Sequence, residues 1–133
     1  MAKKEKKPAI NERIIADIAL AAAEAMGSNE RYTPDKLSCR SDGSPVSVWG
    51  DSADMRDALG WILKKSCDHE KIADIGVRQV RNAAYQVSEL LNEQVIALTG
   101  RSLVTISSDD GREAVVKVLS QIAENIQAKY RTA

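Results

Sequence analysis

The sequence predicts a mainly helical protein: about four helices in a small bundle, with a possible short β-hairpin or three-strand insert over residues 36–49 and 102–107. Apolar residues recur at helical spacing in several segments that end at glycine or at polar connections. The composition, 44% hydrophobic and 29% charged, is that of a globular protein. Phe is absent, so the core must consist largely of Ala, Val, Ile and Leu. We therefore expect a flexible basic tail over residues 1–9 and a single helical domain over residues 10–133.

The first helix is predicted to follow Asn11, a favourable N-cap residue. Ile10 and Ile15 flank this cap at the spacing of a hydrophobic staple, and Gly27 ends the segment. The apolar face consists of Ile14, Ile18, Ala21, Ala22 and Ala25. Such a small-residue face allows a neighbouring helix to approach closely, either in a bundle core or between subunits.

Residues 28–50 lack helical periodicity, and apolar and polar residues alternate on both sides of Asp42-Gly43. The alternating residues are Leu37 and Cys39 before the turn and Val46 and Val48 after it. This pattern predicts a hairpin, in which Pro45 would confine its strand to an edge. The alternative is an ordered loop held in place by Trp49.

A second helix is predicted from a cap at Asp51 or Ser52 to about Lys65, followed by a polar connection over residues 66–70. Its apolar stripe is Met55, Leu59 and Ile62. The Asp residues near its start and the Lys residues at its end suit the helix dipole.

The clearest pattern is an apolar seam over residues 77–98, with Gly100 after it. The seam consists of Val77, Val80, Ala84, Val87, Leu91, Val95 and Leu98. Its spacing is typical of a coiled coil, and a helix of about 22 residues spans about 33 Å. That is longer than a domain of this size needs, so the seam predicts a homodimer interface, with an intramolecular core as the alternative.

After Gly100, the run Ser102–Ser107 has a β-like pattern, and Ser107 with Asp110 resembles a capping box for a last helix. The apolar residues of that helix are Val115, Leu119, Ile122 and Ile126.

Motifs for catalysis are scarce, since the chain has no glycine-rich phosphate loop, paired-histidine motif or Gly-x-Ser-x-Gly elbow. The single histidine, His69, lies beside Cys67, but a zinc site needs four well-placed donors. We expect no enzyme activity, no metal and no cofactor. No apolar run reaches the length of a membrane span, so we expect no membrane partner and a cytoplasmic protein in which Cys39 and Cys67 are reduced.

A nucleic-acid partner is a possibility that rests on two segments, because the 19 basic and 19 acidic residues cancel overall. The first is the tail, with Lys3, Lys4, Lys6 and Lys7. The second, Lys71–Arg78, resembles the turn of a helix-turn-helix motif, although Ala73 precedes Gly76 by three residues rather than four. Arg78, Arg81, Asn82 and Tyr85 then share one helix face, and Arg and Asn are side chains that read guanine and adenine.

Trp49 and Trp61 are candidate anchors of a protein interface, with core packing as the alternative. The seam residues Val80, Val87, Leu91, Val95 and Leu98 complete the predicted interface. We therefore expect a non-catalytic helical interaction module, a homodimer that binds a larger macromolecular partner. Such a chain would act as a small accessory, regulatory or inhibitor-type protein, of the kind that phages and plasmids encode. The alternative is a DNA-binding regulator with a degenerate helix-turn-helix around residues 64–85.

Overall fold

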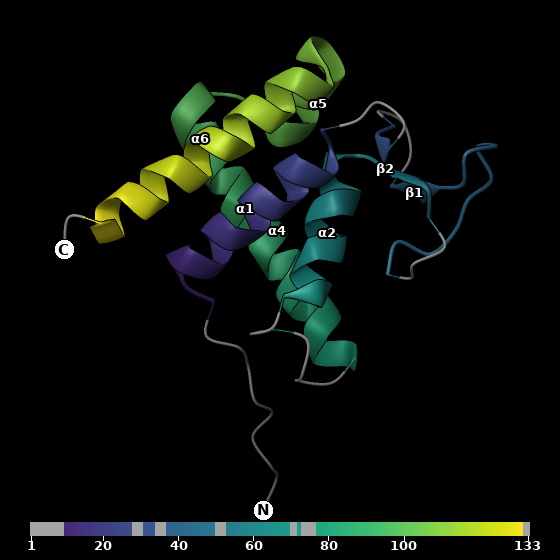
Figure 1. Cartoon of the computed structure of the whole chain (residues 1–133), viewed down its shortest axis with the longest axis horizontal. Helices are drawn as coiled ribbons and strands as arrows, with labels where there is room; N and C mark the ends of the chain where they lie inside the picture. Colours follow the sequence, from purple (N-terminus) through teal and green to yellow (C-terminus); the bar gives the residue numbers. More distant parts are fainter. Residues whose placement is uncertain are drawn as a thin grey trace, which may run out of the picture.

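A computed structural model of the chain describes residues 10–27, 31–33, 37–49, 53–69, 72 and 77–131 (Figure 1). These residues form five helices and one pair of short strands, so the predicted mainly helical bundle is confirmed. In chain order the elements are α1 (Glu12–Ala25), β1 (Ser38–Cys39), β2 (Met55–Arg56), α2 (Ala58–Asp68), α4 (Val77–Thr99), α5 (Leu103–Asp110) and α6 (Arg112–Arg131). No helix within the described ranges is long and apolar enough to cross a membrane.

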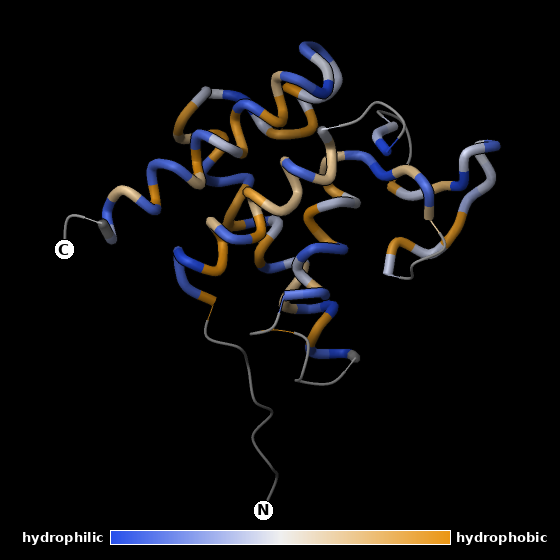
Figure 2. The backbone as a smooth tube through the Cα atoms, in the orientation of Figure 1, coloured by the Kyte–Doolittle hydropathy of each residue, from blue (hydrophilic) through white to orange (hydrophobic). Residues whose placement is uncertain are grey.

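Helix α1 lies at the centre of the bundle, packed most extensively against α6 and also against α2 and α4. The predicted N-cap is confirmed, since the Asn11 side chain accepts a hydrogen bond from the Ile14 N–H at 3.1 Å. Its buried face is rich in small side chains: Ala16, Ala19, Ala22 and Ala23. These let α6 approach closely, and Figure 2 shows hydrophobic positions recurring along the helices between hydrophilic ones.

Helix α4 confirms the predicted long helix and ends before Gly100, whose φ of +78° suits glycine. The centre of its seam, Val87, Leu91 and Val95, is fully buried in the core of this one chain. The alternative of an intramolecular core therefore holds for these three residues. At the carboxyl end of the seam, Leu98 is 46% exposed.

The expected strand over residues 102–107 is wrong, because this segment begins the helix α5. Ser102 is its N-cap, with the side-chain oxygen accepting from the Thr105 N–H at 3.2 Å, and the Asn92 side chain of α4 accepts from the Leu103 N–H at 2.8 Å. Ser107 lies inside the helix, where its hydroxyl is hydrogen-bonded to that of Tyr32, so the expected cap at Ser107 is also wrong. These partners satisfy first-turn N–H groups and favour helix over strand.

The expected hairpin is confirmed at its turn, whereas the regular strand pairing of its first arm is made with a later segment. The Gly43 N–H donates to the Arg40 carbonyl at 2.8 Å, so the chain turns at Asp42-Gly43. However, β1 pairs antiparallel with β2, Ser38 opposite Arg56 and Cys39 opposite Met55, and Val46–Val48 form no strand. Pro45, which has no N–H to donate, makes only an isolated bridge to Cys39.

The start of the second helix also differs from the prediction. Met55 belongs to β2, and α2 begins after Asp57, whose side chain accepts from the Gly60 N–H at 2.7 Å. The expected caps, Asp51 and Ser52, lie outside the described residues.

Gly60 provides a test of how α2 packs against the β1 segment. A Cβ at this position would overlap the Leu37 carbonyl oxygen and lie 3.0 Å from the Arg56 Cβ. Overpacking outweighs the better helix propensity of alanine, so we expect Gly60→Ala to lower the free energy of unfolding by about 1–2 kcal/mol in urea denaturation.

The matched control is Ala97→Gly at an exposed position of α4, which calibrates helix propensity alone and should cost about 1 kcal/mol. A Gly60→Ala variant more stable than the parent chain would contradict the close contact with Leu37.

Candidate interaction surface

Trp49, Arg81 and Tyr85 meet on the outer side of the N-terminal half of α4, and we call these three residues the aromatic cluster. The rings of Trp49 and Tyr85 are edge to face, with centroids 5.6 Å apart and an interplanar angle of 80°. The Arg81 guanidinium carbon lies 5.3 Å from the Trp49 ring centroid. Tyr85 is 48% exposed, Arg81 is exposed and Trp49 is half-buried, so the cluster is accessible to a partner.

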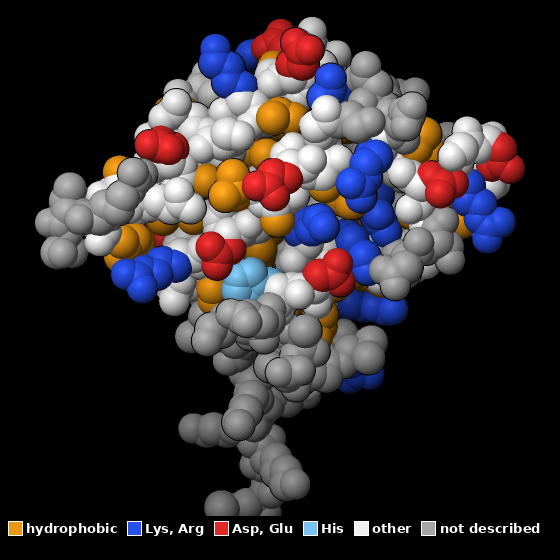
Figure 3. Space-filling model, viewed as in Figure 1, with side chains coloured by type: hydrophobic (Ala, Val, Ile, Leu, Met, Phe, Trp, Pro, Cys, Tyr) orange, Lys and Arg blue, Asp and Glu red, His pale blue; other side chains and the backbone are white. Residues whose placement is uncertain are grey.

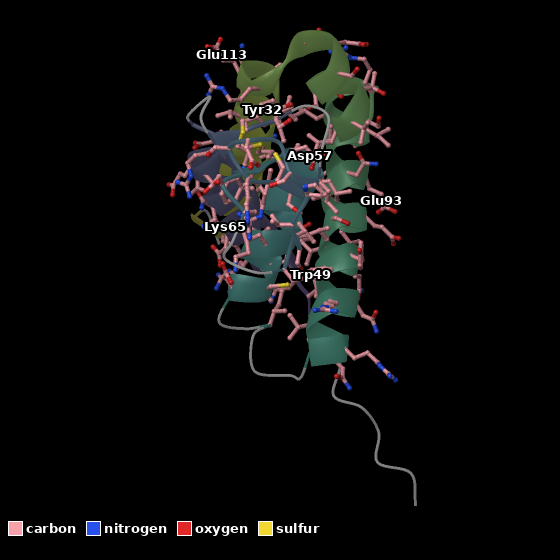
Figure 4. All side chains as sticks on the ribbon, turned by 90° about the vertical axis from the view of Figure 1, so that its right-hand side faces the viewer. Tyr32, Trp49, Asp57, Lys65, Glu93 and Glu113 are labelled. Carbon is pink, nitrogen blue, oxygen red and sulfur yellow. The ribbon has the colours of Figure 1, made fainter. Side chains whose placement is uncertain are left out.

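Local structure explains how the cluster is assembled. Arg81 and Tyr85 are four residues apart on α4 and therefore share a face. Trp49 ends the segment that follows the Asp42-Gly43 turn and packs on a small apolar cluster of Val48, Leu63 and Ala84. Trp49 thus anchors its loop to α2 and α4, and Figure 4 shows it beside α4.

The four residues predicted to contact nucleic acid from the helix, Arg78, Arg81, Asn82 and Tyr85, are all exposed on α4. The same helix exposes Glu89 and Glu93 further along, so its positive charge is confined to the first turns. Lys3, Lys4, Lys6 and Lys7 lie outside the described residues, as does most of the predicted turn, Lys71–Arg78.

The residues predicted to form a protein interface do not all lie at the surface. Trp61 is only 3% exposed, and its indole N–H donates to the Arg31 carbonyl at 2.9 Å, so it belongs to the core. Val87, Leu91 and Val95 are fully buried, and Val80 is partly buried. Of that set, Leu98 is exposed, and Trp49 and Val80 are partly buried.

The sequence pattern assigned Trp49 and the pair Arg81 and Tyr85 to different candidate sites, whereas the structure brings them together. The i, i+4 spacing on α4 predicted only that Arg81 and Tyr85 lie on one helix face. Nothing in the sequence signals the contact with Trp49, because it depends on how a non-helical segment folds over α2.

A groove between α2, α4 and α5 was also missed in the sequence. It has a volume of about 350 Å³, and its lining includes the apolar residues Leu59, Ile62 and Leu103 and the polar residues Asp57 and Asn92. Val104, which is 69% exposed, lies at this groove. Burial raises the pKa of the Asp57 carboxyl, while the hydrogen bond from the Gly60 N–H acts in the opposite direction.

His69 and Cys67 lie in different surroundings at the end of α2. The His69 Nε2 atom lies 3.0 Å from the Asp17 Oδ2 atom and so links the end of α2 to α1. Burial and the nearby Asp68 carboxylate raise the pKa of the Cys67 thiol, which disfavours the reactive thiolate. Cys67 and Cys39 are both free, and no cluster of three or more potential ligands occurs in the described part of the chain.

No protein-family model, no curated protein and no solved structure matches this chain.

The raised pKa of Asp57 leads to a prediction of how the free energy of unfolding depends on pH. Its raised pKa means that the folded chain binds this proton more tightly than the unfolded chain, in which the pKa is near 3.8. The stabilisation from this proton is therefore complete below pH 3.8 and is lost as the pH rises through the higher folded pKa. We expect Asp57→Asn, which keeps an N-capping oxygen, to remove this loss and to be at least as stable as the parent chain at pH 7 in urea denaturation.

The control is Asp57→Ala, which loses the cap and should be about 1 kcal/mol less stable than Asp57→Asn at every pH. A parent chain and Asp57→Asn variant with the same pH profile would show that the folded pKa is not raised.

Proposed function

We propose that the protein is a non-catalytic helical module that binds a protein partner through the aromatic cluster. The observation that carries this proposal is the edge-to-face pair of Trp49 and Tyr85 with the Arg81 guanidinium against the indole ring. Trp, Tyr and Arg are the residue types most enriched in the hot spots of protein interfaces. Here Trp49 contacts both Tyr85 and Arg81 at an accessible surface.

The surroundings of the aromatic cluster support this role because they hold it in place before binding. Arg81 and Tyr85 project from the same face of a regular helix, and Trp49 is fixed by its contacts with a small apolar cluster. Side chains that are already ordered lose less conformational entropy when a partner binds. Tyr85 and Arg81 are both exposed, so these contacts leave the two side chains available to a partner.

Charge indicates which partner surface would fit. Arg78 and Arg81 are exposed in the first turns of α4, whereas Glu89 and Glu93 follow on the same helix. The expected partner segment presents carboxylates beside an apolar side chain that can contact Tyr85. Its acidic groups would face the N-terminal half of α4, since the two glutamates would repel them further along.

Within this proposal the chain acts in the cytoplasm as a small accessory, regulatory or inhibitor-type protein, such as a phage or plasmid product. The proposed homodimer would use surfaces other than the centre of the α4 seam, because Val87, Leu91 and Val95 are buried. Among the seam residues whose burial the structure describes, Leu98 is the most exposed to a second copy.

A DNA-binding regulator is the second candidate. Arg78 and Asn82 are exposed four residues apart on α4, the spacing of side chains on one helix face, and they suit guanine and adenine edges. The aromatic cluster competes with this candidate for Arg81, whose guanidinium lies against Trp49.

Photo-crosslinking tests the protein-binding proposal. With benzoylphenylalanine in place of Tyr85, we expect one discrete crosslinked protein in cells that express the chain naturally. Arg81→Glu should reduce the yield at least about tenfold, because hot-spot changes cost about 2 kcal/mol or more. The matched control is the same probe at Lys117, an exposed position of α6, where that adduct should be absent. An adduct of equal yield at both positions, or no adduct at all, would contradict the proposal.

Titration of fluorescent duplex DNA at about 50 and 200 mM salt separates the two candidates. The protein-binding proposal predicts no affinity that depends on Arg78 and Arg81. Salt-sensitive binding that survives removal of residues 1–7 and is lost in the Arg78→Ala/Arg81→Ala variant would instead establish the DNA-binding regulator.

A further inference from the structure

The solvent-facing side of α4 carries charges of opposite sign at its two ends. Its exposed side chains follow one another at intervals of three, four or seven residues, so they form one line along the helix. We call this line, with the two exposed charged residues that flank it, the outer stripe: Arg78, Arg81, Asn82, Tyr85, Glu89, Glu93 and Ile96. In Figure 4, α4 runs along one edge of the molecule and Glu93 points outward from it.

The charges of the outer stripe are available to a second molecule. Among the described residues, no ion pair includes Arg78, Arg81, Glu89 or Glu93. Arg81 lies against the Trp49 ring, and this contact leaves its positive charge uncompensated. Arg81 and Glu89 are separated by about two helical turns, or about 12 Å along the axis, which is too far for a direct pair.

The order of these charges along α4 makes the outer stripe complementary to itself. Arg78 and Arg81 lie eight and five residues before Gln86, and Glu89 and Glu93 lie three and seven residues after it. A second copy of α4, packed antiparallel about a two-fold axis near Gln86, therefore brings the arginines of each copy opposite the glutamates of the other. A parallel copy would bring like charges together. Two-fold dimers that use one surface of each copy are the commonest closed assemblies of identical chains.

Apolar side chains lie along the same surface. Tyr85 is half-exposed and adjacent to Gln86, so the two tyrosine rings of an antiparallel pair would meet close to the axis. Ile96 is also half-exposed, and the strongly exposed Val104 of α5 lines a groove together with Glu89. The N-terminal half of the second α4 would cover these two side chains. The surface of one helix face is small, so the expected dimer is weak and sensitive to salt.

The face of the molecule drawn in Figure 3 is less suited to pairing with its own copy. There, Lys and Arg side chains gather over α2 and beside the β1–β2 pair. Across a two-fold axis such a group would meet its own copy, and like charges at an interface repel. On α4 the two signs are separated along one helix, so an antiparallel copy brings opposite charges together.

We propose that the outer stripe binds the outer stripe of a second copy of this chain, antiparallel about a two-fold axis near Gln86. This proposal rests on the proposed function, because it identifies the partner segment of the aromatic cluster as α4 of the second copy. The segment expected there presents carboxylates beside an apolar side chain, and Glu89, Glu93 and Ile96 have this chemistry. The inner seam of α4 stays within the core of each copy.

Sedimentation velocity of the full chain tests the self-association. We expect an equilibrium between monomer and dimer whose dissociation constant rises at least about tenfold between about 50 and 500 mM salt, because exposed charge pairs are screened. A chain that remains monomeric at about 0.5 mM in low salt would overturn the proposal. A dimer whose dissociation constant is unaffected by salt would overturn it as well.

Two charge-reversal variants test the outer stripe itself. Arg78→Glu/Arg81→Glu makes the stripe acidic and Glu89→Arg/Glu93→Arg makes it basic, so each variant alone should be monomeric where the parent chain is dimeric. An equimolar mixture of the two should form a heterodimer, a result that misfolding of either variant cannot produce. The control, Arg40→Glu/Lys117→Glu, reverses two charges at exposed positions outside α4 and should dimerise as the parent does. A mixture that stays monomeric contradicts the pairing.

Cysteine crosslinking tests the antiparallel arrangement. Copies of position 86 meet near the axis, whereas copies of position 96 lie about 30 Å apart, with about ten helical residues on each side of the axis. Mild oxidation should therefore give a covalent dimer of Gln86→Cys and little of Ile96→Cys, which is exposed on the same helix. Equal yields would overturn the arrangement. A monomeric chain whose probe at Tyr85 still captures another protein would exclude self-association and leave the proposed function standing.

Discussion

The close packing of the alanine-rich face of α1 is the constraint on which the other contacts depend. A chain without Phe and with few aromatics cannot fill wide gaps between helices, so its helices must approach one another closely. Ala19 and Ala22 have no exposed surface, and α1 contacts α6, α2 and α4. The placement of α2 and α4 around this central helix in turn decides which of their residues reach solvent.

Helix α2 connects the core to the candidate surface. Ile62 and Leu63 are buried, and Leu59 and Cys67 pack against the small apolar cluster beneath Trp49. One helix of 11 residues therefore supports the aromatic cluster that α4 presents to solvent. The self-association proposal requires Glu89 and Glu93 in addition to the aromatic cluster, so it can fail while the protein-partner proposal stands.

The features predicted correctly from the sequence are those that depend on local information. The cap at Asn11, the length of α4 and the apolar spacing of α6 all follow from residues close together in the chain, and the structure has each of them. The wrong predictions concern segments whose structure depends on distant residues: the partner of β1 comes after a long connection, and α5 gains its first-turn acceptor from Asn92 of α4. Val104, Thr105 and Ile106 are β-branched and favour a strand on propensity, which tertiary contacts override. The aromatic cluster was only partly visible for the same reason, since it joins a helix to a non-helical segment.

The burial of the α4 seam within its own chain has an evolutionary consequence. Substitutions at Val87, Leu91 or Val95 affect folding first, because large-to-small changes in a core cost several kcal/mol. Substitutions at exposed positions of the same helix, such as Asn82 and Gln86, usually change stability by about 0.5 kcal/mol or less. Selection can therefore alter what the outer face of α4 recognises in a diverging lineage while the inner face continues to specify the same bundle.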